Sequence, residues 1–275
     1  MRVAVVGHVE VIDFVRVARV PLPGEIVSAT ESWRETGGGG GVAAVELAAL
    51  AGRATLFVAL GDDPVGREAA VELGGRGLDV EATWRPAPQR RAFTFVDDQG
   101  ERTITLLSPK LHPHGDDPLP WERLDETDAV YFTAGDPAAL VQARRARVLV
   151  ATARELPTLK AGRVRLDAIV HSRADISERY LAGDLEPPPR LAVSTAGAAG
   201  GEYQTDDGRT GTFAAAPVPG RVVDSYGAGD CFAAGLTFAL GAGMDVEPAL
   251  AFASQCGAGA LTGRGVHPTK PPVAL

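Results

Sequence analysis

The segment Gly227-Ala228-Gly229-Asp230 combines three small residues with one carboxylate at the start of an expected helix. The two glycines let the backbone turn sharply and bring bare N–H groups up to a ligand. Residues 230–240 are nearly all apolar or small and are followed by Gly241, which indicates a buried helix whose first amides lack partners within the helix. Such a helix end favours negative charge. The segment therefore predicts an anion-binding loop.

Asp230 itself has two interpretations. In the first, its carboxylate accepts the proton of a hydroxyl, while the backbone at 227–229 neutralises the charge of a group transferred to that hydroxyl. In the second, it is an acidic residue that only stabilises the start of a helix. The four residues alone do not decide between a catalytic and a structural carboxylate, so the rest of the chain must be considered.

Composition limits the class of protein. The chain has 275 residues, of which 45% are hydrophobic, and this is enough for one large α/β domain over residues 1–275. A net charge of −8 argues against a broad basic surface, so we expect no nucleic-acid partner and no membrane partner. None of the lysines Lys110, Lys160 and Lys270 follows a glycine loop, which excludes a P-loop. An anion site must then rely on backbone amides and arginine.

The ends and the cysteines indicate a compartment. Cys231 and Cys256 offer neither a disulfide framework nor the spacing of a metal site. The chain enters an apolar run at 3–6 without the pattern of a signal peptide, and no segment approaches the length of a membrane span. We therefore expect a cytoplasmic protein.

A mainly parallel sheet is expected to form the body of the fold. The run at 3–6 ends at Gly7 and is typical of a strand buried on both faces. Further short apolar strands alternate with helices, which favours a parallel sheet covered on both sides. These strands are expected at 55–60, 129–133, 148–151, 168–171 and 191–195. The last helix is expected at 246–261, and its small residues at 253–260 admit either a flat ring such as adenine or another helix.

A second, smaller sheet is expected from strands in which polar and apolar residues alternate. Such strands are predicted at 13–20, 26–33, 92–96 and 103–106, the last two joined by the hairpin signal Asp97-Asp98-Gln99-Gly100. The small sheet would be inserted into the large domain from about 13–35 and 90–107.

Five glycines at 37–41 lead into an alanine-rich helix that ends before Gly52. The spacing Gly38-x-Gly40-x-x-Ala43, with Asp62 further on, imitates a dinucleotide-binding fingerprint. That fingerprint needs a buried strand just before the glycines, and residues 31–36 are too polar to form one. A flexible linker would not explain the helix that follows directly.

Asp224-Ser225-Tyr226-Gly227-Ala228-Gly229-Asp230 resembles the second signature of the ribokinase-like (phosphofructokinase-B) carbohydrate kinases, which often reads Asp-Thr-Thr-Gly-Ala-Gly-Asp. Gly38-Gly39, together with Gly61-Asp62-Asp63-Pro64-Val65-Gly66, is similar to the first signature, although Ala43 stands where that family usually has Asn. The resemblance extends from Gly7 to 263–265. It implies an α/β three-layer sandwich with a mainly parallel central sheet and a small β-sheet lid.

The resemblance also implies a function. Members of that family transfer the γ-phosphoryl group of ATP, with Mg²⁺, to a hydroxyl of a small sugar or sugar-like molecule. Asp13 is taken over from a family Asp after the first strand, where the neighbouring family Asn becomes Glu10. Ser172 and Asp175 stand where the family has Asn-x-x-Glu. The implied roles are a base at Asp230, an anion hole at Gly227, Ala228 and Gly229, substrate contacts at Asp13, Gly38 and Gly39, nucleotide contacts at Ser172, Thr195, Gly197 and Gly200, and a metal contact at Asp175.

Several alternatives stay open. A nucleoside kinase of the same family would share every catalytic residue, and a non-catalytic sugar-binding or regulatory relative would explain Ala43, Ser172 and Asp175. The lid is expected to close over substrate or to join two copies as a homodimer. His112-x-His114 is either a metal pair or, as the flanking prolines favour, a plain loop. Cys231 is interpreted as a packing residue rather than a reactive thiol.

Overall fold

The large sheet forms the centre of the computed structural model, which describes residues 1–269. Its strand order is β13-β12-β11-β10-β9-β8-β1-β4-β5. Seven strands run parallel, and β12 and β13 extend one edge antiparallel. The parallel strands are β1 (Val3–Gly7), β4 (Ala54–Gly61), β5 (Leu78–Arg85), β8 (Ala129–Phe132), β9 (Val148–Thr152), β10 (Ala168–Ser172) and β11 (Leu191–Thr195), and the edge strands are β12 (Gly201–Thr205) and β13 (Thr210–Phe213).

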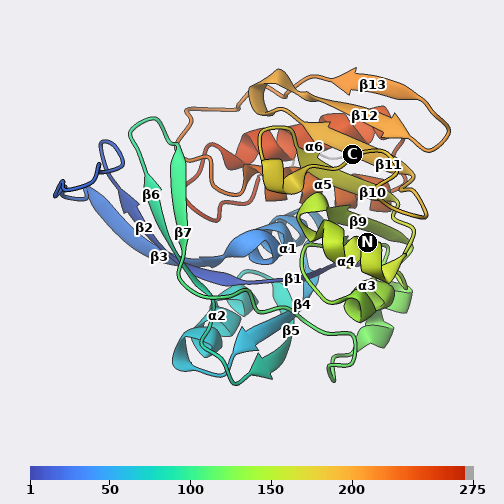
Figure 1. Ribbon diagram of the computed structural model, residues 1–275, viewed down its shortest axis with the longest axis horizontal. Helices are drawn as coiled ribbons and strands as arrows, with labels where there is room; N and C mark the ends of the chain where they lie inside the picture. Colours follow the sequence, from blue (N-terminus) through green and yellow to red (C-terminus); the bar gives the residue numbers. More distant parts are fainter. Residues whose placement is uncertain (270–275) are drawn as a thin grey trace.

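Helices cover both faces of this sheet (Figure 1). Alternate residues of β1 show why, because Val3 and Val5 belong to one hydrophobic core while Ala4 and Val6 belong to the other. The first core is covered by α1 (Gly38–Ala51), α2 (Pro64–Gly75), α5 (Ala228–Gly241) and α6 (Val246–Ala260), and the second by α3 (Pro137–Ala143), α4 (Leu156–Gly162) and the 3₁₀ helix η1 (Trp121–Glu126). The predicted three-layer sandwich is confirmed.

A separate four-stranded sheet, called the lid below, stands beside this body (Figure 1). It consists of β2 (Glu10–Arg16), β3 (Glu31–Gly37), β6 (Arg91–Val96) and β7 (Arg102–Leu106) in the order β3-β2-β6-β7. The predicted hairpin is confirmed, since β6 and β7 pair antiparallel. Strands β2 and β3 come from residues 10–37 and strands β6 and β7 from residues 91–106, so the small sheet draws on two separate regions of the chain.

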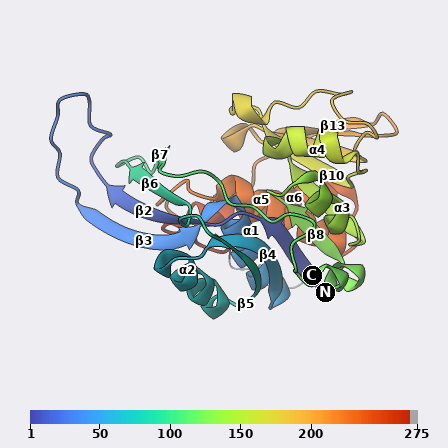
Figure 2. The same ribbon diagram turned by 60° about the horizontal axis from the view of Figure 1, so that its bottom comes forward.

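The boundaries predicted for the first two lid strands are wrong. The strand expected at 13–20 ends at Arg16 and begins earlier, at Glu10, and the strand expected at 26–33 begins only at Glu31. Residues 17–30 form a long connection that reaches out beyond the sheet (Figure 2). Pro21 and Pro23 lie in this connection, and proline cannot donate to a strand ladder. Alternating polarity alone therefore overestimated these two strands.

The glycines expected to form a loop before α1 are instead mostly helical. Gly38 to Gly41 make the first turn of the helix, and Gly37 precedes it. Their small size lets the helix touch the end of β1, because a Cβ on Gly40 would lie only 2.6 Å from the carbonyl oxygen of His8. The glycines are needed for close packing of helix against strand, in addition to any contact with a ligand.

The small residues of α6 pack against α5. A Cβ added to Gly235 would lie 2.7 Å from the Sγ of Cys256, and one added to Gly257 would lie 3.1 Å from the carbonyl oxygen of Ala228. The small residues of α6 that face α5 therefore serve helix packing and do not form a surface for a flat ring such as adenine. Cys231 is buried in the same contact, and burial raises the pKa of its thiol well above the usual value, which supports the packing interpretation. No helix within residues 1–269 is long and apolar enough to cross a membrane.

Candidate active site

The anion loop precedes α5 as the sequence predicts. Gly227 caps the helix in the left-handed region with a φ of 76°, and a Cβ there would lie 2.8 Å from the Cγ1 of Val42. Within residues 1–269, no side-chain hydrogen bond caps the start of α5. Apart from its chain neighbours and the backbone of its own helix, no atom of the described residues lies within 4 Å of the position of a Cβ on Gly229, so the loop is open at this point. An anion can approach the free N–H groups there.

The first half of the same signature holds this loop in place. The buried carboxylate of Asp224 accepts hydrogen bonds from the backbone N–H groups of Tyr226, at 2.7 Å, and of Gly265, at 3.0 Å. The hydroxyl of Tyr226 accepts a hydrogen bond of 2.9 Å from the N–H of Gly38. The anion loop is thereby fastened to the first turn of α1, which carries the other glycine signature.

Gly39 and Asp230 meet at the carboxyl ends of β1 and β8. A Cβ on Gly39 would lie 3.1 Å from the Oδ1 of Asp230, 3.2 Å from the Oγ1 of Thr133 and 3.3 Å from the Cε1 of His8. The missing side chain keeps the space in front of the carboxylate free. The structure thus brings a predicted substrate residue directly to the predicted base. Thr133 and His8, which follow β8 and β1, were not identified from the sequence.

The electrostatics of Asp230 suit proton transfer. Burial raises the pKa of its carboxyl above the usual value, the positive charges of Arg154, His8 and Arg102 partly offset this, and the negative charge of Glu10 adds to it. A raised pKa makes the carboxylate a better base than an ordinary aspartate. A negatively charged group beside Asp230 would meet the same positive charges.

Glu10 is a further carboxylate of this region, and it is buried. Its Oε1 accepts a hydrogen bond of 2.6 Å from the Nε of Arg90 and lies 3.4 Å from the Nε2 of His8. Burial alone would raise the pKa of Glu10, but His8 and Arg90 outweigh it and hold the pKa at about 2. A Cβ on Gly38 would lie 3.0 Å from the Cγ of Glu10. An ionised acid therefore borders the glycines of α1.

Asp13 lies on the other side of the lid strand. The side chains of Ile12 and Phe14 point toward the anion loop, where the ring of Phe14 meets Tyr226 edge-on at 5.1 Å between centroids. Because side chains alternate along a strand, Asp13 faces away. Its carboxylate pairs with Arg34 at 2.7 Å and Arg91 at 2.6 Å. The structure does not bring Asp13 to Asp230, and its contact with substrate stays a prediction.

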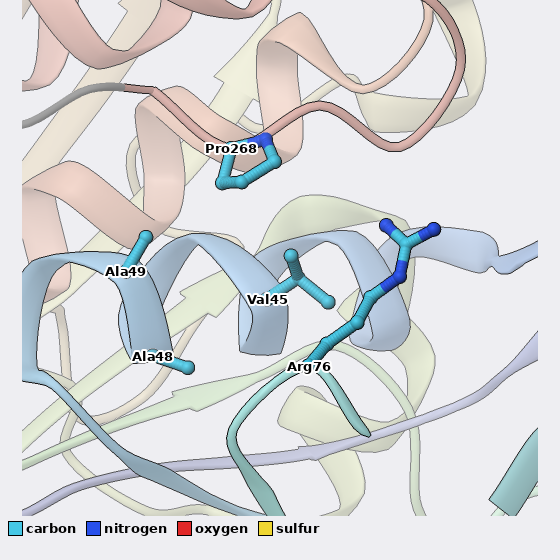
Figure 3. A pocket seen from close by; sticks show the side chains of 5 residues that line it. All are labelled: Val45, Ala48, Ala49, Arg76 and Pro268. Carbon is cyan, nitrogen blue, oxygen red and sulfur yellow. The ribbon is translucent and has the colours of Figure 1, made fainter. Parts of the chain in front are cut away.

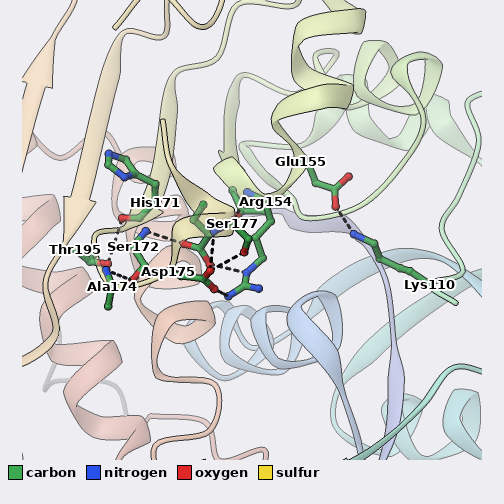
Figure 4. A network of polar contacts seen from close by, with 11 residues as sticks. Lys110, Arg154, Glu155, His171, Ser172, Ala174, Asp175, Ser177 and Thr195 are labelled. Atoms are coloured by element: carbon green, nitrogen blue, oxygen red, sulfur yellow. Dashed lines mark hydrogen bonds and ion pairs between the residues drawn. The ribbon is translucent and has the colours of Figure 1, made fainter. Parts of the chain in front are cut away.

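The predicted nucleotide residues gather at the carboxyl ends of β10 and β11. Ser172 and Thr195 are opposite each other in the register of these strands, and the hydroxyl of Thr195 donates to the carbonyl oxygen of His171 at 3.3 Å (Figure 4). Gly197 and Gly200 take left-handed φ values of 56° and 80° around the 3₁₀ helix η4 (Gly197–Ala199). Ligands of open α/β sheets bind at such strand ends.

Asp175 caps the 3₁₀ helix η3 (Ile176–Glu178) and pairs with Arg154, whose Nη2 lies 2.8 Å from its Oδ2 (Figure 4). Arg154 belongs to η2 (Ala153–Glu155), and its Nε is 2.5 Å from the Oε1 of Glu178. The other oxygen of Glu178 accepts a hydrogen bond of 2.7 Å from the N–H of Ser172. Sequence reasoning missed Arg154 and Glu178, although an acid three residues after Asp175 was a usable signal.

His112 and His114 lie in an irregular segment, as the loop interpretation expects. One oxygen or nitrogen atom from each of His114, Asp116 and Asp117 lies within 4.8 Å of the others. The carboxylate of Asp117, however, is held by two hydrogen bonds of 2.7 and 2.6 Å from the guanidinium of Arg85. This carboxylate is committed to an arginine, which argues against a metal site.

A cavity of about 360 Å³ lies elsewhere, between α1 and the segment around Pro268 (Figure 3). Its polar side chain is Arg76, which already donates to the carbonyl oxygen of Val266 at 2.8 Å and to Glu72 at 3.3 Å. The lining is otherwise apolar and includes none of the predicted site residues; it consists of Val45, Ala48, Ala49, Arg76 and Pro268.

The fold and this site define a class, an α/β protein with a glycine-lined loop at a helix start, a half-buried carboxylate beside it and a β-sheet lid. The chain belongs to the pfkB family of carbohydrate kinases, whose model matches residues 1–168 and 184–272. It is 31% identical to the ATP-dependent ribose-1-phosphate kinase of Halopiger xanaduensis over 94% of this chain and 91% of that protein. It is 28% identical to a fructokinase of Salmonella typhimurium over 86% and 88%, respectively. The fold matches the crystal structure of a putative ribokinase from Agrobacterium tumefaciens with a TM-score of 0.83, 23% identity and coverage of 98% and 94%.

Proposed function

We propose that this protein is an ATP-dependent kinase that phosphorylates a hydroxyl of a small sugar or sugar-like molecule. The observation that carries the proposal is the meeting of Gly39 and Asp230, because it joins an open acceptor position to a base beside an anion loop. Family membership and the two curated relatives, which are both sugar kinases by name, support the same reaction.

The residues divide the chemical work. The acceptor hydroxyl lies over Gly39 and gives its proton to Asp230 as its oxygen attacks the γ-phosphorus of ATP. The backbone N–H groups at 227–229 stabilise the charge on the transferred group. The segments around Ser172, Thr195, Gly197 and Gly200 hold the nucleotide, with its phosphates directed along the strand ends toward α5. The bond to the leaving ADP oxygen breaks as the new ester forms.

The acceptor pocket favours a sugar over a nucleoside. Glu10, which His8 and Arg90 contact, is polar and lies beside Gly38, where a nucleoside base would need an apolar or aromatic surface. An ionised carboxylate accepts hydrogen bonds from hydroxyl groups. The non-catalytic alternative is disfavoured by Asp230, since binding alone does not require a carboxylate of raised pKa beside an anion loop.

The carboxylates of Asp175 and Glu178 fit a magnesium ion. Mg²⁺ takes oxygen ligands and is commonly held by one or two carboxylates together with phosphate and water. When bound with ATP, the ion would neutralise phosphate charge. Arg154 pairs with both carboxylates, so it competes with the ion and should loosen its binding. Full activity in EDTA would contradict a metal role, and an unchanged Mg²⁺ dependence in Asp175→Ala would contradict this assignment.

We also propose that the protein acts in the cytoplasm and pairs through the outer face of the lid. That face carries Phe93 and Phe95, whose rings contact each other edge-on at 5.1 Å between centroids and are only partly buried. Sedimentation should give a dimer that Phe95→Asp dissociates. A wild-type monomer at micromolar concentration would contradict pairing.

The direct test is a screen for ADP release with pentoses, hexoses, sugar phosphates, sugar acids and nucleosides as acceptors. The proposal expects one of the sugar classes to raise ADP release well above the rate without acceptor, and mass spectrometry to find the phosphorylated product. Phosphorylation of nucleosides alone would replace the proposal with the nucleoside kinase. No release with any acceptor, despite measurable ATP binding, would favour the non-catalytic relative.

A further inference from the structure

Positive charge reaches the anion loop from two directions. Within residues 1–269 it does not come from lysine, because Lys110 and Lys160 pair with Glu155 and Asp184. The arginines whose charges act on Asp230 are Arg154, from the body of the protein, and Arg102, from the lid strand β7. The two arginines differ in how many of their N–H groups already have partners.

Arg102 has donors to spare. Its Nη1 donates to the carbonyl oxygen of Ser225 at 2.8 Å and to the hydroxyl of the same residue at 3.2 Å. These contacts use one of its three nitrogens. Within the described residues no carboxylate lies within ion-pair distance of its guanidinium, whereas Arg154 is shared between Asp175 and Glu178. An exposed arginine beside an anion loop, with free N–H groups and no counter-ion, is suited to bind an oxyanion.

The backbone of the lid fixes Arg102 in this position. The N–H of Ser225 donates to the carbonyl oxygen of Gly100 at 3.0 Å, so the turn between β6 and β7 contacts the segment 224–226 just before the anion loop. A Cβ on Gly100 would lie 3.2 Å from the carbonyl oxygen of Val223, and the φ of this glycine is 80°. Gly100 thus allows the turn to pack closely against Val223, and this contact places Arg102 near the anion loop.

We propose that Arg102 is a catalytic arginine supplied by the lid, which binds an oxyanion at the mouth of the anion loop once the lid rests on Ser225. This inference rests on the proposed kinase function. Two sources of the oxyanion share the same chemistry, namely the phosphoryl group in transfer and a phosphate or carboxylate already carried by the acceptor sugar. Either one completes the hydrogen bonds that Arg102 leaves unmade.

The test compares Arg102→Gln and Arg102→Lys with wild type, and Arg19→Gln serves as a matched control, because Arg19 is an exposed lid arginine that pairs with Glu25 in the 17–30 connection. With an acceptor active in wild type, Arg102→Gln should lose roughly 10- to 100-fold in kcat/KM, as expected for charge-assisted hydrogen bonds. Arg102→Lys should recover part of this, and Arg19→Gln should stay within about 2-fold of wild type.

The two sources separate in the kinetic constants. A loss in kcat with every acceptor identifies the transferred phosphoryl group, and a rise in KM confined to phosphorylated or acidic sugars identifies the acceptor. Added guanidinium should restore turnover to Arg102→Ala in either case, which a structural role would not produce. Arg102→Gln kinetics within 2-fold of wild type would overturn the proposal.

Binding gives a result that does not depend on turnover. Isothermal titration of the protein with inorganic phosphate should show weaker binding to Arg102→Gln than to wild type and Arg19→Gln. Equal binding to all three would overturn the role of Arg102 even if no acceptor were found. The absence of turnover in wild type would instead count against the proposed function.

Discussion

The two ends of the proposed active site are built in different ways. At the phosphoryl end, 224–230, the groups proposed to contact an anion are backbone N–H groups, and one carboxylate beside them is the proposed proton acceptor. At the acceptor end, Glu10, His8 and Arg90 form a cluster of side chains beside the glycines of α1. The first end follows its family signature closely, while the second has Glu10 and Ala43 where the signature residues are Asn. Under the proposed function, the reaction therefore depends on one short segment, whereas substrate choice depends on side chains that the lid and the body bring together.

The largest effect is expected at the phosphoryl end, from Asp230→Asn. The substitution keeps the size of the side chain and its capacity to accept at the helix start, but it removes the proton acceptor. Turnover should fall roughly 10²- to 10⁴-fold, or about 3–5 kcal/mol of barrier, while nucleotide binding measured by titration stays near wild type. A turnover within a few-fold of wild type, with a confirmed acceptor, would show that Asp230 only stabilises the first turn of α5.

At the acceptor end, Glu10→Gln and Asp13→Asn should be compared with each other. The two residues are three positions apart on β2, and their side chains lie on opposite faces of this strand. Glu10→Gln removes the charge that borders Gly38, so the acceptor KM should rise roughly 10-fold and kcat should change less. Asp13→Asn should have a smaller effect, because Arg34 and Arg91 already bind that carboxylate. A larger rise in KM for Asp13→Asn would show that Asp13 reaches the substrate as the family resemblance implies.

The features that could be predicted from the sequence are those that depend on neighbouring residues. The loop at 227–230, the helix behind it, the buried strands and the β6–β7 hairpin are set by local residue types, and their existence was predicted correctly. Arg154, Glu178, Thr133 and His8 were missed because their importance arises only when separate strand ends meet. The strands β5, β12 and β13 were also missed, since half-buried strands at the two edges of the sheet carry a weaker pattern than central ones.

Glu46 lies behind both ends, buried on α1 against Cys231 of α5 and Cys256 of α6. Its Oε2 accepts a hydrogen bond of 2.7 Å from the N–H of Thr269, and its Oε1 has no partner within the described residues. Burial raises the pKa of Glu46 from 4.5 to about 7. The folded protein therefore holds this proton more tightly than the unfolded chain, so the contribution of Glu46 to stability is lost as pH rises from about 4.5 to about 7.

The last substitution affects stability rather than turnover. Relative to wild type, Glu46→Gln should gain up to about 3 kcal/mol in free energy of unfolding between pH 4.5 and pH 8, because glutamine cannot ionise. Urea denaturation of both proteins at several pH values measures the difference. A difference that does not change with pH would show that Glu46 has an ordinary pKa.

The central claim is that Asp230 takes the proton of the acceptor, and the pH dependence of the single-turnover rate tests it most directly. The rate should fall on the acid side with a midpoint above 3.8, the ordinary pKa of an aspartate, because burial raises that of Asp230. Removing the negative charge in Glu10→Gln should move the midpoint to lower pH, and removing the positive charge in Arg102→Gln should move it to higher pH. A rate with no acid limb, or a midpoint that neither substitution moves, would contradict Asp230 as the base.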